Sequence, residues 1–210
     1  MADPSVDRSL FRAFAEMLEY PHASPLERAR ACAALLAPLS PEAAALVDEF
    51  AAVAERTPHG DLQEAYTRTF DLNATYCPYV GYHLFGESYK RSVFLVRLKT
   101  EYRAVGVETG SEIPDHLALV LRFLAASEDA DLTGEVIVDA LLPALGRMVR
   151  GAGAVESCDH DAPPDPAQDP QIYHGVLEAL RLLLAARGPS ASPDASGERP
   201  VGDREPSATG

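Results

Sequence analysis

Residues 112–124 read EIPDHLALVLRFL and decide the fold. Pro114 fixes the approach of the chain, Asp115 can cap a helix, and His116 would lie in the first helical turn. The residues that follow, 117–124, are apolar almost all round. A helix that is apolar on nearly every side is buried by its neighbours, so we expect this helix at the centre of the fold.

Helical periodicity continues on both sides of this segment, and no stretch alternates convincingly as a strand would. The sequence therefore predicts an all-α fold, a single helical-bundle domain. The expected helices run from about Leu10 to Tyr20, from Ser24, from Ser40 to about Pro58, from Asp61 to Phe70, from about Ser88 to Val105, from Asp115, from about Leu132 to Val149 and from Gln171 to Arg187. In the long Ser88–Val105 helix, the residues expected to face inward are Val93, Leu95, Leu98 and Tyr102.

Local residues indicate how several of these helices begin and end. Ser24 and Ser40 each precede a proline and can cap a helix, and Asp61 can cap the next one. Gly106 is a C-terminal stop. Pro143 predicts a kink or a break inside its helix.

Composition divides the chain into four parts. Residues 1–150 are the expected helical domain. Residues 151–170 hold four prolines and five acidic residues, which is typical of a linker or long loop. Residues 171–187 are the C-terminal helix, and residues 188–210 form a Pro-, Ser- and Gly-rich tail that we expect to be disordered.

The charge and the cysteines narrow the class of protein. The net charge of −14 disfavours nucleic acid or an anionic membrane as partner and suits a basic one. Cys32, Cys77 and Cys158 lie far apart, as incidental thiols of a reducing compartment do.

The N-terminus lacks the basic head of a signal peptide, and no apolar run approaches the ~18–20 residues that span a bilayer. We expect a cytoplasmic protein without membrane insertion.

No catalytic or metal-binding pattern stands out. The six histidines include no HxxxH pair, there is no CxxC, and no glycine-rich phosphate loop is present. Cys158 and His160 lie in the expected linker. A helical hydrolase using His83, Glu87 or His116 would need these side chains to converge in one cleft.

Two segments are distinctive. The first is the segment from Tyr66 to Tyr89, which holds five of the eight tyrosines. These rings either fill the core or bind a partner protein. His83 and Glu87, four residues apart, could pair on a helix face. The second segment is residues 112–117, where a capping role competes with an acid–base role for the adjacent Asp and His.

These segments, in this order, resemble the assembly chaperones of respiratory nitrate reductase, the delta subunit family, which is related to the TorD-type chaperones. The resemblance rests on Leu18-Glu19-Tyr20-Pro21, Tyr66-Thr67-Arg68-Thr69-Phe70-Asp71, His83-Leu84-Phe85-Gly86-Glu87-Ser88, the helix through Leu95, Leu98 and Tyr102 to Gly106, and Glu112-Ile113-Pro114-Asp115-His116-Leu117 with the helix that follows. It covers roughly residues 9–149.

The resemblance implies an all-α cytoplasmic chaperone, not an enzyme. Such proteins bind the apo catalytic subunit of a molybdoenzyme, often at its N-terminal tail, and keep it competent for cofactor insertion before membrane attachment or export. The client carries the molybdenum-bisMGD cofactor, and the chaperone carries none. Nitrate reductase is the first expectation for the client; a selenate, chlorate or dimethyl sulfide enzyme is the alternative, as is the role of a permanent structural subunit.

We expect the client peptide in a groove between the Tyr66–Glu87 segment and the start of the Asp115 helix. Aromatic side chains there would hold apolar client positions, and carboxylates would meet basic ones. The candidate residues are Tyr66, Phe70, Tyr82, His83, Phe85, Glu87, Asp115 and His116.

Overall fold

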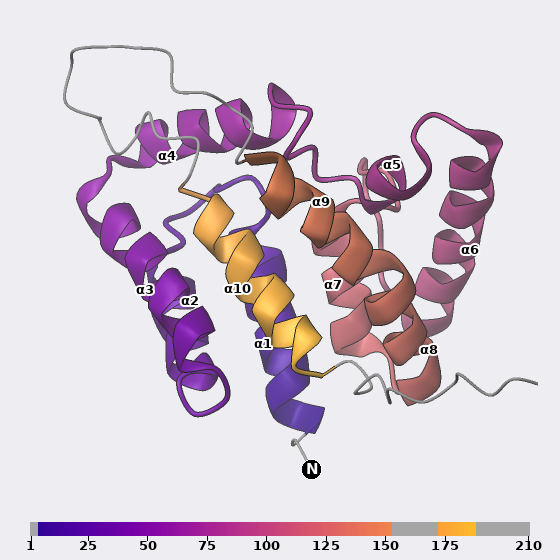
Figure 1. Ribbon diagram of the computed structural model, residues 1–210, viewed down its shortest axis with the longest axis horizontal. Coiled ribbons are helices and arrows are strands. Elements are labelled where there is room, and N and C mark those ends of the chain that lie inside the picture. The colour runs from indigo at the N-terminus through magenta and orange to yellow at the C-terminus, as the bar shows by residue number, and fades with distance from the viewer. Residues whose placement is uncertain (1–3, 153–171, 188–210) are drawn as a thin grey trace, which may run out of the picture.

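The computed structural model describes residues 4–152 and 172–187, and every regular element in these ranges is a helix (Figure 1). The prediction of an all-α fold is confirmed. The expected tail, and the expected linker from residue 153 on, lie outside the described residues. The elements are α1 (Pro4–Met17), α2 (Leu26–Leu36), α3 (Pro41–Arg56), α4 (His59–Tyr66), the π-helical turn η1 (Thr67–Asp71), α5 (Val80–Phe85), α6 (Tyr89–Val105), α7 (Leu117–Ala126), α8 (Ala130–Glu135), the π-helical turn η2 (Val136–Leu141), α9 (Leu142–Ala152) and α10 (His174–Ala185).

The core forms around α7, as its sequence predicts. Every α7 side chain except Arg122 and Ala126 is buried. The apolar face of α1, including Leu10 and Phe14, packs against it. On the other side of α1, α10 lies against α3 and α9 with Leu180 fully buried, so the C-terminal helix is part of the same helical body (Figure 1).

The helix ends follow the sequence in some places and differ in others. Ser40 caps α3 by accepting a hydrogen bond from the Ala43 N–H at 3.3 Å, and Gly106 ends α6 in the left-handed conformation, as predicted. The expected cap at Asp61 is wrong, because α4 begins two residues earlier, after Pro58. At the start of α2, the Ser24 hydroxyl accepts a hydrogen bond from the Leu26 N–H at 3.4 Å, so the expected cap at Ser24 is confirmed.

Pro143 distorts its helix, as predicted. The distortion takes the form of the π-helical turn η2, which directly precedes α9 and widens the chain ahead of the proline. A proline has no N–H to donate and crowds the carbonyl four residues earlier, and a wider turn relieves both effects.

α6 stands at one edge of the molecule and packs on one side only (Figure 1). Leu98 and Tyr102 are buried, as predicted, but Val93 is 52% exposed, so the expectation that it faces inward is wrong. α6 is nevertheless the longest helix described, and no helix in the described ranges combines the length and apolarity that crossing a membrane requires.

Candidate functional site

The two distinctive segments of the sequence meet in the structure. Tyr79 and His116 form an isolated antiparallel bridge, and the Val80 N–H donates to the carbonyl oxygen of Asp115 at 2.8 Å. The chain leading into α5 is therefore tied to the turn that opens α7. The candidate site lies beside this contact between the two segments.

Asp115 is fully buried and paired with Arg91 of α6. The Arg91 Nε and Nη2 donate to its two carboxylate oxygens at 2.9 and 3.3 Å, which raises the pKa of Arg91. The guanidinium also lies 5.6 and 5.9 Å from the ring centroids of Tyr79 and Tyr82. Gly81 permits this arrangement, because a Cβ there would lie 2.7 Å from the Asp115 Oδ2.

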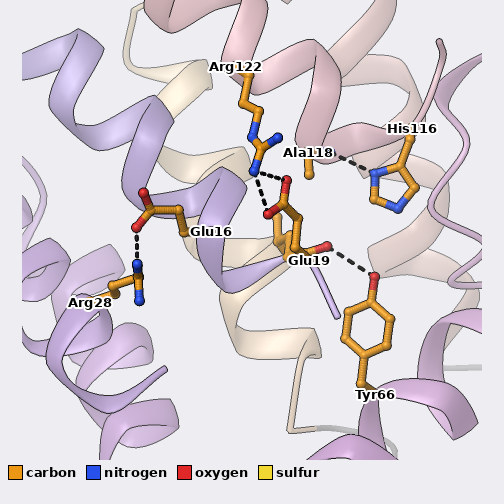
Figure 2. Close-up of polar contacts among 8 residues, drawn as sticks. Glu16, Glu19, Arg28, Tyr66, His116, Ala118 and Arg122 are labelled. Carbon is orange, nitrogen blue, oxygen red and sulfur yellow. Dashed lines mark hydrogen bonds and ion pairs between the residues drawn. The ribbon is translucent and has the colours of Figure 1, made fainter. Parts of the chain in front are cut away.

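His116, and not Asp115, caps α7. Its Nδ1 accepts a hydrogen bond from the Ala118 N–H at 3.2 Å (Figure 2). Burial lowers the pKa of His116 below its ordinary value of 6.5. A neutral imidazole suits this position, because the capping Nδ1 must accept a hydrogen bond and the positive end of a helix disfavours a cation.

A polar cleft of about 610 Å³ opens beside this cap. Residues from the end of α1, from η1, from α7 and from the loop after α6 line it. We call it the acidic cleft, because four carboxylates line it against one guanidinium. Its charged and aromatic lining residues are Glu19, Asp71, Glu108, Glu112, Arg122, His22, His116, Tyr20, Tyr66 and Tyr79.

The negative charge of the acidic cleft is only partly neutralised. Arg122 points toward Glu19 and pairs with both of its carboxylate oxygens, at 2.6 and 2.7 Å (Figure 2). The pKa of Glu19 is raised above its ordinary value, chiefly by burial, although Arg122 acts to lower it. Asp71, Glu108 and Glu112 form no ion pair with any described residue. A cationic ligand would therefore find free carboxylates here.

Tyrosine rings form one wall of the acidic cleft. Tyr66 is 4% exposed and its hydroxyl donates to the carbonyl oxygen of Leu18 at 3.2 Å. Tyr20, which is 39% exposed, lies edge-on to it with ring centroids 5.6 Å apart. Behind Tyr66, the rings of Phe70 and Tyr173 continue the cluster into the core. The cluster thus both fills the core and reaches the surface.

The side chains of α5 do not line the acidic cleft. The His83 Nε2 donates to the carbonyl oxygen of Cys77 at 2.7 Å, and burial lowers the pKa of His83. α5 ends at Phe85 and the chain turns at Gly86, where φ is +60°. Glu87 lies beyond that turn, so the predicted pairing of His83 and Glu87 on one helix face is wrong.

The structure separates the eight candidate residues into groups. Tyr66 and His116 line the acidic cleft, while Phe70 and Asp115 are buried without lining it. Tyr82, His83 and Glu87 lie in or next to α5, outside the cleft. Phe85 lines a separate apolar groove. The cleft residues that sequence reasoning missed include Glu19, Tyr20, Asp71 and Glu112, although each belongs to a segment that carries the family resemblance.

The described residues do not bring together His83, Glu87 and His116, the three side chains that a helical hydrolase would use. His83 and Glu87 are absent from the cleft that His116 lines, and no three His, Cys, Asp or Glu side chains within the described ranges are placed to hold a metal ion. The carboxylates and tyrosines of the acidic cleft can accept hydrogen bonds from a cationic ligand and contact an apolar one.

Comparison with known proteins identifies the family. The chain belongs to the nitrate reductase delta subunit family, whose model matches residues 36–147. It is also similar to the probable nitrate reductase molybdenum cofactor assembly chaperone NarJ of Bacillus subtilis (strain 168), with 41% identity over 68 residues. That match spans 32% of this chain and 37% of the relative. Asp71, Glu112, His116 and Arg122 lie within the residues that the family model covers.

Proposed function

We propose that the protein is an assembly chaperone for a respiratory molybdoenzyme, with nitrate reductase as the first choice. It binds the apo catalytic subunit in the cytoplasm, through the N-terminal tail, and supports molybdenum cofactor insertion before membrane attachment or export. The client carries the molybdenum-bisMGD, while the chaperone binds no cofactor and catalyses no reaction. Membership of the delta subunit family supports this proposal, as does the similarity to the Bacillus relative, which is named as a probable molybdenum cofactor assembly chaperone.

The acidic cleft is the proposed binding site for the tail. Its carboxylates would accept hydrogen bonds from client arginine or lysine side chains, and the exposed ring of Tyr20 would cover an apolar client residue. A hydrogen bond to a charged group contributes about 1.5–3 kcal/mol when water is excluded, and less in an open cleft. The free carboxylates of Asp71 and Glu112 are the observation that carries this assignment.

Calorimetric titration with the N-terminal peptide of the cognate catalytic subunit tests the proposal. We expect saturable binding of about one peptide per chain that weakens with salt, because the cleft charges are solvent-accessible. Asp71→Asn with Glu112→Gln should weaken binding about tenfold. Asp48→Asn with Glu49→Gln, a matched loss of two exposed carboxylates on α3, should change nothing. If neither the peptide nor the apo-subunit binds the unaltered protein, the proposal is wrong.

The extent of the site along α5 needs its own variant. Tyr82 is half-buried and Glu87 is exposed, and both lie outside the acidic cleft. Tyr82→Ala combined with Glu87→Ala leaves the cleft carboxylates in place. A loss of peptide affinity in this folded variant would extend the site to α5, and unchanged affinity would confine it to the cleft.

A permanent structural subunit is the second candidate, and the description of the family as a delta subunit favours it. A permanent subunit would co-purify in stoichiometric amount with the mature membrane-bound enzyme, whereas a chaperone would leave after assembly. The identity of the client is a separate question. Binding of tail peptides from nitrate, selenate, chlorate and dimethyl sulfide enzymes, measured side by side, would rank these clients.

A further inference from the structure

α6 leaves an apolar groove open on its inner side. Only Leu98 and Tyr102 of this 17-residue helix are buried, and a space of about 190 Å³ separates it from α8 and η2. We call this space the α6 groove. Its apolar lining includes Leu84, Phe85, Phe94, Leu98, Phe123 and Val136.

The size of the α6 groove suits side chains and not a backbone. The groove can therefore receive a few apolar side chains from a helix lying across it. Phe85 is 36% exposed and its ring packs edge-on against Phe94 with centroids 5.7 Å apart, which gives the groove an aromatic entrance.

The rim of the α6 groove is negatively charged. Arg97 and Glu135 face each other across it at 3.8 Å, an exposed pair that neutralises itself. Glu101 and Asp139 also line the groove and form no ion pair with any described residue. An apolar floor with two free carboxylates complements a helix that has an apolar stripe flanked by lysine or arginine.

Two other occupants fit this chemistry poorly. The parts of this chain outside the described residues, 1–3, 153–171 and 188–210, contain one large apolar residue each, Met1, Val155 and Val201. They lack the apolar stripe that the groove floor requires. A second copy of this chain carries the same net charge of −14, so its approach to an acidic rim is electrostatically unfavourable.

We propose that the α6 groove docks an amphipathic, basic helix of the client catalytic subunit that lies outside the N-terminal tail. This inference rests on the proposed chaperone function and adds a second contact to it. The groove and the acidic cleft share no lining residue and differ in chemistry. Because the two surfaces differ, each should bind a different client segment. The acidic cleft would bind the basic tail, and the α6 groove would bind the amphipathic helix.

Reversal of the free rim charges tests the inference. Glu101→Lys with Asp139→Lys should weaken binding of the full-length apo-subunit about tenfold and leave binding of the tail peptide unchanged. The control, Asp48→Lys with Glu49→Lys, makes the same charge change on α3, at the opposite end of the molecule (Figure 1), and should leave both affinities unchanged. Phe85→Asp, at a part-exposed position, should repeat the selective loss by removing the aromatic entrance.

Several outcomes would overturn the inference. If the unaltered protein binds the apo-subunit and the groove variants bind it equally well, the groove is no contact, although the chaperone function stands. If the groove variants lose the tail peptide as well, the tail itself occupies the groove. If Phe85→Asp instead abolishes a concentration-dependent dimer of the unaltered protein, a second copy is the occupant. Failure of the unaltered protein to bind either ligand would refute the chaperone function itself.

Discussion

The Nε atom of Arg91 lies 2.9 Å from the Oδ2 of Asp115, whose side chain has no solvent exposure. This contact joins α6 to the turn before α7, and the rings of Tyr79 and Tyr82 flank the guanidinium. Tyr79 lines the acidic cleft, while Phe94, three residues after Arg91, lines the α6 groove. One buried ion pair thus holds the segments that form both proposed binding surfaces.

The two partners of this pair should differ in the cost of their loss. Arg91→Ala leaves the Asp115 carboxylate buried without a counter-ion, and we expect a loss of about 3 kcal/mol in the free energy of unfolding. Asp115→Asn should cost less, because the Arg91 side chain is 19% exposed and can turn toward water. Urea titration measures both. Arg97→Ala breaks an exposed pair and should cost less than about 1 kcal/mol. Equal costs for the two variants at the buried pair would contradict this account.

Gly81 should not tolerate a methyl group, although alanine is the better helix former by about 1 kcal/mol. The new Cβ would lie 2.7 Å from the Asp115 Oδ2 and 3.0 Å from the Phe94 Cδ1. Because Arg91 fixes the carboxylate, the overlap should outweigh the propensity, and we expect a net loss of about 1–2 kcal/mol. Calorimetry would show a lower Tm. Gly134→Ala in α8, where no atom lies within 4 Å of the new Cβ, should raise it.

The sequence predicts those helix features that depend on neighbouring residues. Ser40 caps α3 and Gly106 ends α6, because a hydroxyl beside a helix start and a glycine at a left-handed position act locally. The same reasoning fails at Asp61, since Pro58 already starts α4. It fails at Val93 for a different reason: periodicity shows that α6 has an apolar side, but only the arrangement of the neighbouring helices decides how far that side is covered.

The candidate site was less predictable, because its contacts are long-range. The position of Asp115 just before α7 suggested that it caps this helix. Its side chain instead pairs with Arg91, which lies 24 residues away in another helix. Glu19 meets Arg122 across 103 residues of chain. A single sequence indicates which segments are distinctive, and here those segments do meet, but it contains no signal for which pairs of side chains touch.

The buried cap at His116 should make stability depend on pH. Its pKa is lowered in the folded protein, chiefly by burial, so the unfolded chain binds the proton more readily. The stabilising contribution is therefore complete above the unfolded pKa of 6.5 and declines as the pH falls toward the folded pKa. The slope is at most about 1.4 kcal/mol per pH unit.

Replacement by asparagine isolates this contribution. His116→Asn keeps an acceptor for the Ala118 N–H but cannot be protonated in this range, so its unfolding free energy should fall less between pH 7.5 and pH 5.5 than that of the unaltered protein. Urea titrations at several pH values measure the difference. His59→Asn, at an exposed position, controls for the exchange of imidazole for amide. Parallel profiles for the unaltered protein and His116→Asn would show that the cap is not the titrating group.

Arg122 should compete with the client for Glu19. In the free protein the guanidinium already occupies both oxygens of this part-buried carboxylate, at 2.6 and 2.7 Å. Arg122→Gln removes this competitor for Glu19 and, with it, the positive charge of the cleft lining. A basic tail peptide should therefore bind about three- to tenfold more tightly. Stability should fall by less than about 1 kcal/mol, because the pair is part-exposed.

A second substitution shows whether Glu19 is the group set free. Glu19→Gln should weaken binding of the peptide, and the combination with Arg122→Gln should bind more weakly than Arg122→Gln alone. The neighbouring pair of Glu16 and Arg28 is the matched control, because Arg28→Gln frees a carboxylate outside the acidic cleft and should leave affinity unchanged (Figure 2). Weaker binding by Arg122→Gln would mean that the guanidinium contacts the client itself, since an arginine that only blocks Glu19 cannot contribute to affinity.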